Sequence, residues 1–269
     1  MGNILDIFLC SHAPQIVTKP KLNNEYQSQI DKVQNALLEI GNKVKKIDPD
    51  TVILIGADHL ESYFLDNYPM IMIPVVEKTH GRMFGEDYEY DVDMSLAKTI
   101  LLNLLRDGFE PSFSQRFKLD HPFRSPLKYI FKNFTKPIIP IHVNSNIFPV
   151  ISIKRAYDLG KAIRKIIQEE TSKNVVIIGT GGLSHYPGTP FYGKVDLDFD
   201  NYLLDLIQKG RADEIISLDP EALESSGNIE FRTWITAMGF AGNFKGNLVV
   251  RVPTFHIDYA VMELKSDYR

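Results

Sequence analysis

The sequence has one cysteine, no long apolar run and no surplus of basic residues. Because Cys10 stands alone, an intrachain disulfide and a cysteine-rich zinc or iron–sulfur site are excluded. The longest apolar runs, such as Thr51–Gly56 and Val175–Gly179, are far shorter than the ~20 residues that span a bilayer. With 34 acidic and 30 basic residues, the formal charge of -4 offers no positive field to nucleic acid or anionic lipid. We therefore expect neither nucleic acid nor a membrane as a partner.

The N-terminus lacks the features of a targeting segment. It has no basic region, and Asp6 interrupts its apolar stretch, which argues against a signal peptide. The chain begins Met-Gly, but position 6 is Asp where a myristoylation signal has Ser or Thr. Together with the single cysteine, this predicts a cytoplasmic protein.

Composition and periodicity predict one α/β domain. The chain of 269 residues is 44% hydrophobic and 24% charged, which is typical of a globular protein. Apolar residues at three- and four-residue spacing predict helices over Ala156–Ile167 and Leu96–Leu105. Short apolar runs predict strands, and these are Ile4–Cys10, Thr51–Gly56, Met70–Val75, Pro137–His142, Asn174–Gly179 and Asn247–Val252. The alternation predicts a three-layer α/β/α sandwich with a mixed central sheet, formed by residues 1–269 as a single domain.

Two segments between these elements are predicted to be long loops. Val75–Tyr90 is rich in charge, glycine and aromatic residues, and it is the better candidate for a lid over a ligand. Ser184–Lys194 is the second candidate. We identify no internal repeat and no linker between domains.

Three of the seven histidines lie just beyond predicted strands. They are His12, His59 and His185, and the last of these follows a glycine-containing loop. In an open α/β sheet, ligands collect beyond the carboxyl ends of the strands, where loops converge. These histidines are therefore the first candidates for a functional site.

Two histidines and one carboxylate form a suitable set of ligands for Fe(II), and they leave three coordination positions open. A catechol can occupy two of these positions through its oxygens while O2 takes the third. His12 and His59 supply the imidazoles in this hypothesis. Glu230, at the start of a predicted helix that carries Trp234 and Met238 on one face, supplies the carboxylate.

Each of these residues also has a structural alternative. A histidine such as His12 is common in turns. Asp58 can orient the ring of His59 or merely make a surface contact beside it. An acid in the first turn of a helix, such as Glu230, complements the helix dipole, and Asn228 can cap that helix.

The remaining histidines suggest different roles. His121 lies between prolines in a segment that predicts a fixed turn followed by a helix, and it is either an active-site residue or a loop histidine bonded to the backbone. His185 suits general acid/base chemistry because the ordinary pKa of histidine, about 6.5, lies near neutrality; otherwise it is a surface residue. His142 and His256 fall in strands and are expected in the core or a pocket wall. His80, in the possible lid, is expected to be solvated.

Taken in order, these segments resemble the LigB-type class III extradiol dioxygenases, the family of the catalytic subunit of protocatechuate 4,5-dioxygenase. The resemblance spans nearly the whole chain, and its most specific element is Gly179–His185. The segments that carry it are Ser11–Pro14, Asp58-His59, Asp120-His121 with Pro126-Leu127, Ile139–Asn144, Gly179–His185, and Gly227–Glu230 with Trp234.

The resemblance implies an Fe(II)-dependent enzyme that inserts both atoms of O2 into a catecholic ring and gives an open-chain semialdehyde. By resemblance, the metal ligands are His12, His59 and Glu230. His185 falls on the acid/base histidine of the family, and His121 falls on a second active-site histidine that contacts the substrate. The resemblance also implies the three-layer α/β/α fold.

Three further features concern how a substrate is held. Pro122 stands where many relatives have Gly after the Asp-His pair, and Phe255–Val261 is shorter than its counterpart in the protocatechuate enzymes. Arg124 is a candidate for binding an anionic substituent through its planar guanidinium, or else a solvated surface arginine.

Several alternatives stay open at this point. An o-aminophenol-type or catechol amino acid ring-cleaving dioxygenase would use the same ligands. A Memo-like metal-binding protein without oxygenase activity would share the fold, and a zinc hydrolase can also use two histidines and a glutamate. A homo-oligomer or a small accessory subunit is a further partner to consider, since relatives form dimers or work with a second subunit.

Overall fold

Strands and helices alternate along most of the chain. The protein is described by a computed structural model that covers residues 1–266. The strands are β1 (Asn3–Cys10), β2 (Thr51–Gly56), β3 (Ile71–Pro74), β4 (Lys78–Met83), β5 (Glu86–Asp91), β6 (Ser112–Ser114), β7 (Ile138–Val143), β8 (Asn174–Thr180), β9 (Phe244–Pro253) and β10 (Asp258–Ser266). The helices are α1 (Gln15–Thr18), α2 (Asn24–Ile47), α3 (Met94–Arg106), α4 (His121–Ile130), α5 (Ile153–Glu170), α6 (Leu197–Lys209), α7 (Ala212–Ile216), α8 (Pro220–Ser225) and α9 (Phe231–Ala241).

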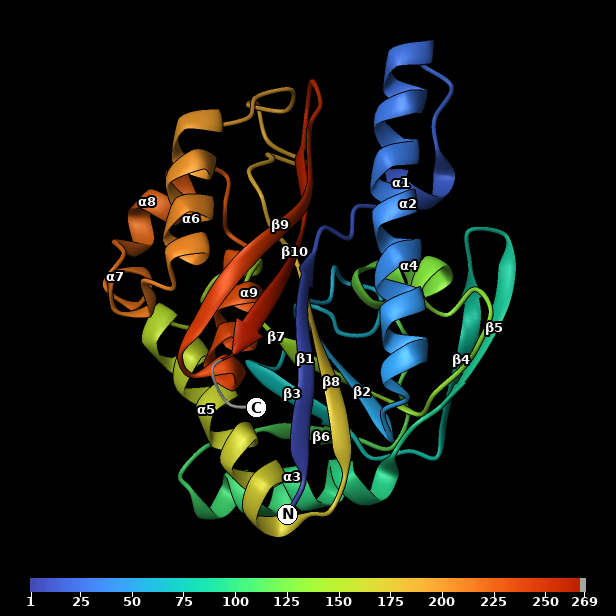
Figure 1. Ribbon diagram of the computed structural model, residues 1–269, viewed down its shortest axis with the longest axis vertical. Coiled ribbons are helices and arrows are strands. Elements are labelled where there is room, and N and C mark those ends of the chain that lie inside the picture. The colour runs from blue at the N-terminus through green and yellow to red at the C-terminus, as the bar shows by residue number, and fades with distance from the viewer. Residues whose placement is uncertain (267–269) are drawn as a thin grey trace.

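One large sheet forms the middle of the molecule (Figure 1). Its strand order is β6-β3-β7-β2-β8-β1-β10-β9. The central strands β7, β2, β8 and β1 run parallel. In contrast, β3 runs antiparallel to β7, and β10 runs antiparallel to β1. The mixed sheet expected from the sequence is therefore confirmed.

Helices cover both faces of this sheet (Figure 1). The side chains of α3, α5 and α9 pack on one face, and those of α2 and α4 pack on the other. Every residue of β2 and β7 is buried, which is why these strands are continuous apolar runs rather than alternating patterns. The three-layer α/β/α sandwich is confirmed.

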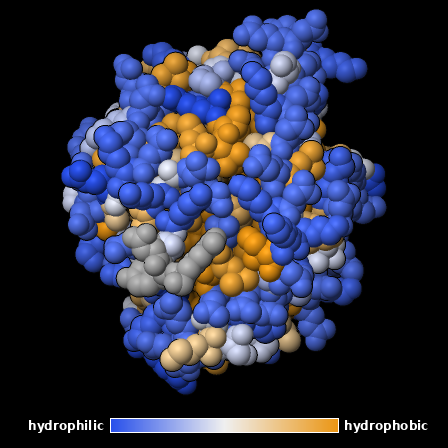
Figure 2. Space-filling view, viewed as in Figure 1, coloured by the Kyte–Doolittle hydropathy of each residue, from blue (hydrophilic) through white to orange (hydrophobic). Residues whose placement is uncertain are grey.

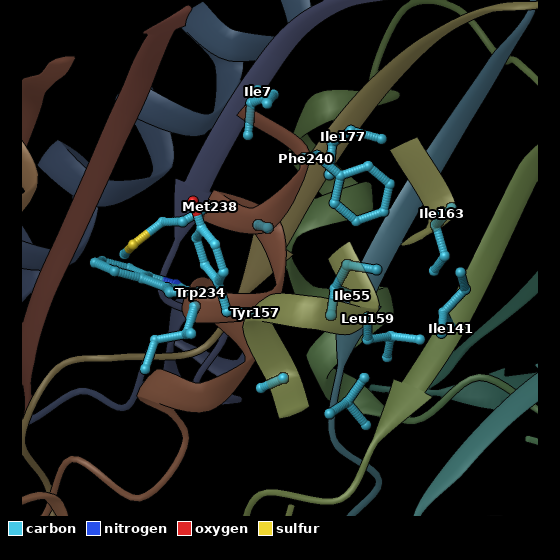
Figure 3. Packing of buried hydrophobic residues seen from close by; sticks show 14 of the residues in the cluster. Ile7, Ile55, Ile141, Tyr157, Leu159, Ile163, Ile177, Trp234, Met238 and Phe240 are labelled. Atoms are coloured by element: carbon cyan, nitrogen blue, oxygen red, sulfur yellow. The ribbon is translucent and has the colours of Figure 1, made fainter. Parts of the chain in front are cut away.

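Close packing of α5 against α9 fixes the position of α9 (Figure 3). A Cβ atom on Gly239 of α9 would lie 3.0 Å from the Cα atom of Gly160 of α5, so glycine at both positions allows the helices to approach. Trp234 and Met238 are fully buried on α9, as their spacing predicted. Because α9 is fixed, Glu230 at its N-terminus is fixed as well.

The expected lid over Val75–Tyr90 is wrong, because this segment forms most of a β-hairpin. β4 and β5 pair along their whole length, from Lys78 opposite Asp91 to Met83 opposite Glu86. Tyr88 packs into the core on the side of α2 and α4. Buried and exposed residues alternate at the end of β5, but the exposed ones are charged, so the segment resembled a loop in the sequence. The second expected loop, Ser184–Lys194, is confirmed, since it consists of turns and one isolated bridge.

The β9 edge of the sheet is partly exposed, and half of its ten residues are intermediate between buried and exposed. The space-filling view of this side shows a largely hydrophilic surface with hydrophobic areas near its middle (Figure 2). Within residues 1–266, no helix combines the length and apolar character needed to cross a membrane.

Candidate metal centre and active site

Five side chains from distant parts of the chain meet at one edge of the sheet. His12 follows β1, His59 follows β2, and His185 follows β8. His121 begins α4, and Glu230 is the N-cap residue of α9. Because β1, β2 and β8 are parallel, their carboxyl ends lie at the same edge. The strand-end histidines therefore share one site, as their positions in the sequence suggested.

The Glu230 carboxylate lies at the centre of this cluster. His59 Nε2 is 3.0 Å from Glu230 Oε1, and the Nε2 atoms of His12 and His185 are each 3.3 Å from Glu230 Oε2. Glu230 is only 2% exposed, and its Oε1 atom has no hydrogen bond of acceptable geometry. A buried carboxylate in this position needs a compensating positive charge.

The electrostatics of the cluster favour such a charge. Burial by itself would raise the pKa of Glu230, but the neighbouring His12 and His59 rings lower it well below its ordinary value. Burial lowers the pKa of His59, but the Glu230 and Asp120 carboxylates outweigh this effect and raise it to about 10. The carboxylates therefore stabilise a positive charge on the His59 ring. A divalent cation bound between these side chains can supply positive charge in place of that proton.

The geometry of the cluster fits a metal ion. Two ligand atoms that each lie about 2.1 Å from one ion, at right angles, are about 3.0 Å apart. The separations between the histidine nitrogens and the Glu230 oxygens are close to this value. His12, His59 and His121 also present ligand atoms that all lie within 4.8 Å of one another. These histidines and Glu230 can therefore hold a metal.

Asp120, rather than Asp58, lies beside the histidine rings. Asp120 Oδ2 is 3.3 Å from His59 Nδ1, and Asp120 Oδ1 is 2.9 Å from His121 Nδ1. Burial opposes ionisation of Asp120, but the hydrogen bond with the His121 ring and the charge of the nearby His59 ring lower its pKa. A carboxylate bound to the outer nitrogen of a ligand histidine fixes the orientation of the ring. Asp58 is buried and its carboxylate bonds to the backbone, so neither alternative for Asp58, orienting the His59 ring or making a surface contact, is correct.

Asp58 instead shapes the loop that carries His59. Its carboxylate accepts hydrogen bonds from the backbone N–H groups that follow it, including those of Ser62 and Tyr63. Its own N–H donates to His142 Nδ1 at 2.9 Å, so the ring proton of His142 is on Nε2 and is donated to the Pro69 carbonyl. His142 is thus the satisfied core histidine that the sequence suggested.

The His185 ring is oriented so that it can accept a proton inside the site. Its Nδ1 atom donates a hydrogen bond to the Leu183 carbonyl at 3.0 Å, which leaves the lone pair on Nε2 facing Glu230. His121 has a similar orientation, with Nδ1 donating to Asp120. Burial and the neighbouring His59 and His12 rings lower the pKa of His121 to about 4, although Asp120 acts in the opposite direction. This low pKa leaves the His121 ring neutral near pH 7.

A buried carboxylate, Asp200, connects the two loops that carry His185 and Glu230. Asp200 accepts hydrogen bonds from the backbone N–H and hydroxyl groups of Ser184, and from the side chain of Asn228 at 2.8 Å. The amide oxygen of Asn228 accepts no hydrogen bond, and Glu230 is the N-cap residue, so Asn228 does not cap α9 as its sequence position suggested. Asp200 was not predicted as a functional residue, because it lies in the first turn of α6, where an acid is common.

The cluster lines a cavity of ≈ 190 Å³. Tyr192 and His256 form part of its wall, and the Ser184–Lys194 loop contributes to the site. The expected place of His256 in a pocket wall is confirmed, but it lies between β9 and β10 rather than in a strand. A larger cavity of ≈ 400 Å³ lies at the opposite end of β1, and no histidine in residues 1–266 lines it. His80 is exposed on β4, as expected.

Arg124 does not line this cavity. Its guanidinium is buried, donates to the hydroxyl of Tyr90 at 3.1 Å and lies 3.4 Å from a carboxylate oxygen of Glu86. It also stacks over the rings of Tyr88 and Tyr90. Neither expectation for Arg124, a substrate contact or a solvated surface residue, is correct.

The fold and the site define an α/β protein with a buried histidine–carboxylate centre that can hold a metal ion. Residues 6–262 match the family model of the catalytic LigB subunit of aromatic ring-opening dioxygenase. The chain therefore belongs to the LigB family of ring-cleaving dioxygenases, and the resemblance found in its sequence is confirmed.

Curated relatives agree with this assignment. A 2,3-dihydroxyphenylpropionate/2,3-dihydroxicinnamic acid 1,2-dioxygenase from Pseudomonas putida is 25% identical over 80% of this chain and 86% of its own. A similarly named enzyme from Rhodococcus jostii is 28% identical over 75% of this chain and 63% of its own, and one from Photorhabdus laumondii is matched over only 54% of its length. The crystal structure of the uncharacterized protein JW3007 from Escherichia coli K12 superposes on this chain with a TM-score of 0.65. The match covers 97% of this chain and 100% of that chain at 9% sequence identity, which shows a shared fold.

Proposed function

We propose that this chain is an Fe(II)-dependent extradiol dioxygenase in which His12, His59 and Glu230 hold the metal. It would insert both atoms of O2 into a catecholic ring and give an open-chain semialdehyde. The observation that carries the proposal is the approach of three histidine nitrogens to within 3.0 to 3.3 Å of the Glu230 carboxylate, in a chain of the LigB family. The catalytic domain would comprise residues 1–269.

Glu230 is preferred to His121 as the third ligand for an electrostatic reason. Three histidines alone would leave the buried Glu230 carboxylate next to the metal without bonding to it, whereas direct coordination neutralises its charge. Two histidines and one carboxylate on one side of Fe(II) also leave positions open for substrate and O2.

Bound Fe(II) would supply a Lewis acid and a binding position for O2. The residues of this chain would then divide the remaining work. His185 Nε2 would take a proton from one catechol hydroxyl, because its lone pair faces the site. His121 would contact the substrate and, once protonated, donate a hydrogen bond to developing negative charge. Asp120 would hold the rings of His59 and His121 in position.

The proposal is tested by reconstituting the protein with Fe(II) under anaerobic conditions and measuring O2 uptake. The substrate panel consists of catechol, protocatechuate, gallate, 2,3-dihydroxyphenylpropionate and 2-aminophenol. Uptake with a catechol and a semialdehyde product would support the proposal. Uptake with 2-aminophenol alone would support the aminophenol alternative. Metal binding without uptake on any substrate would reject an oxygenase in favour of a Memo-like protein, and hydrolysis with zinc would indicate a hydrolase.

The ligand assignment is tested separately through metal content. The His12→Ala variant should lose the metal, because a ligand within 3.3 Å of Glu230 is removed. Gln208→Leu, at an exposed position of α6, is the matched control and should retain it. Full iron occupancy in His12→Ala would remove His12 from the ligand set.

Two further expectations stay predictions. They are localisation in the cytoplasm, and assembly with a second copy of the chain or with a small accessory subunit.

A further inference from the structure

The buried carboxylate of Asp200 lies behind the site rather than in it. Asp200 is fully buried and does not line the cavity. Its hydrogen bonds reach the loop that carries His185 and the loop that carries Glu230. Because it is neither exposed nor in the cavity wall, Asp200 can affect a reaction only through the residues that it holds.

The first connection runs through Ser184, the residue before His185. Asp200 Oδ1 accepts from the Ser184 N–H group at 3.2 Å, and Asp200 Oδ2 accepts from the Ser184 hydroxyl at 2.6 Å. The Ser184 hydroxyl accepts from the N–H group of Asp196, and the Ser184 carbonyl accepts from that of Asp258. Every polar group of Ser184 therefore has a partner, and the direction of the chain into His185 is fixed.

The second connection runs through Asn228, two residues before Glu230. The Asn228 side-chain amide donates to Asp200 Oδ1 at 2.8 Å. The Asn228 carbonyl accepts from the Phe231 N–H group at 3.0 Å, which closes the turn that contains Glu230. A change in the position of Asn228 would therefore move Glu230.

The two loops also contact each other directly, but through a weaker connection. The His185 N–H group donates to the Gly227 carbonyl at 3.2 Å. One hydrogen bond does not fix the relative orientation of two loops, and the Asp200 carboxylate adds three more. His185 Nε2 and Glu230 Oε2 are 3.3 Å apart, and groups that act together in a site must be held within roughly 0.5 Å of the productive geometry.

We propose that Asp200 is a positioning residue, which places His185 through Ser184 and Glu230 through Asn228. This inference rests on the function proposed above. Each connection should affect a different property, because one leads to the base and the other to a metal ligand. A merely structural role of Asp200 would instead change both properties in proportion to the lost stability.

Variants of the two connecting residues provide the test. The Fe(II) dissociation constant is measured anaerobically by competition with a chromophoric chelator, kcat by O2 uptake at saturating Fe(II) and catechol, and stability by urea denaturation. Ser184→Ala should lower kcat about 10- to 100-fold and leave the Fe(II) dissociation constant unchanged. Asn228→Ala should raise the Fe(II) dissociation constant about 10- to 100-fold, with a smaller loss of kcat.

Variants of Asp200 itself should combine or restore these effects. Asp200→Ala should show both losses. Asp200→Asn should restore both values, because its amide oxygen still accepts from Ser184 and Asn228. Asp205→Ala, at a half-exposed position on the same helix, is the matched control and should equal the wild type. Wild-type values in Ser184→Ala and Asn228→Ala, or losses in both properties that follow the lost stability, would overturn the proposal.

A probe that needs no O2 separates this inference from ring cleavage. The absorption spectrum of 4-nitrocatechol changes when the compound loses a proton, so its anaerobic binding to the Fe(II)-loaded protein reports proton transfer in the site. Ser184→Ala should bind it in ionised form less completely than the wild type does. If the wild type shows no O2 uptake, this result and the metal affinity of Asn228→Ala would still support the role of Asp200, while ring cleavage would be rejected.

Discussion

Replacing Asp200 with asparagine should make the stability of the protein less sensitive to pH. Asp200 is fully buried. Burial raises its pKa to about 7, and the negative charge of Asp258 adds to this effect, while hydrogen bonds from Ser184 and Asn228 oppose it. Asp258 forms an ion pair with Arg251 through one oxygen, and its other oxygen, Oδ1, otherwise lacks a partner. A protonated Asp200 can donate to that oxygen, and an asparagine amide can do the same.

The sign and size of the effect follow from the two pKa values. The ordinary pKa of this carboxyl is 3.8, and the folded protein raises it to about 7. Between these values the folded state keeps a proton that the unfolded state releases, so the free energy of unfolding falls as pH rises through this window. The fall is up to about 1.4 kcal/mol per pH unit, or about 4 kcal/mol in total. Asp200→Asn has no carboxyl group to titrate at this position. Its free energy of unfolding relative to that of the wild type should therefore rise from about pH 4 to about pH 7 and then level off.

Urea denaturation at a series of pH values measures this difference in the presence of a chelator. The single tryptophan, Trp234, is fully buried and serves as the fluorescent probe. Asp205→Asn, at a half-exposed position of α6, is the matched control and should run parallel to the wild type. Asp200→Ala should cost about 3 to 5 kcal/mol, because it leaves the donors of Ser184 and Asn228 unpaired. Parallel curves for Asp200→Asn and the wild type would refute the argument.

Three further variants test the site. His185→Ala should keep its metal and lose about 10²- to 10⁴-fold in turnover, because a general base is removed; metal analysis and O2 uptake check this, and unchanged turnover would rule out the assignment. In Gly181→Ala, the new Cβ would overlap the Thr233 hydroxyl and lie 2.6 Å from the Glu230 carbonyl oxygen. We expect a loss of about 1 to 3 kcal/mol in stability and weaker metal binding, measured by denaturation and metal titration; wild-type values for both would contradict this close approach. Arg124→Ala should destabilise the protein by about 1 to 3 kcal/mol in urea denaturation, because its contacts with tyrosine side chains are lost. Its preference between charged and neutral catechols, measured by O2 uptake, should not change. An altered preference would show that Arg124 affects substrate binding.

Local patterns in the sequence predicted the layers of the fold and three members of the site. Apolar runs and helical spacing depend on which side chains face the core, so they indicate strands and helices without knowledge of the partners. His12, His59 and His185 could be grouped because parallel strands end at one edge of a sheet. The β4–β5 hairpin was not predicted, because its buried Tyr88 is surrounded by charged residues that resemble a loop. β10, which lies between β1 and β9, was not predicted either.

The sequence by itself determined the α/β class, the family and the histidines at the strand ends. Only the tertiary structure decided how each side chain acts within the site. It shows that Asp120 rather than Asp58 lies beside the His59 ring, and that Arg124 lies away from the cavity. The physical reason is that strand and helix patterns reflect local burial, whereas contacts between distant residues depend on how the layers pack and where each side chain then points.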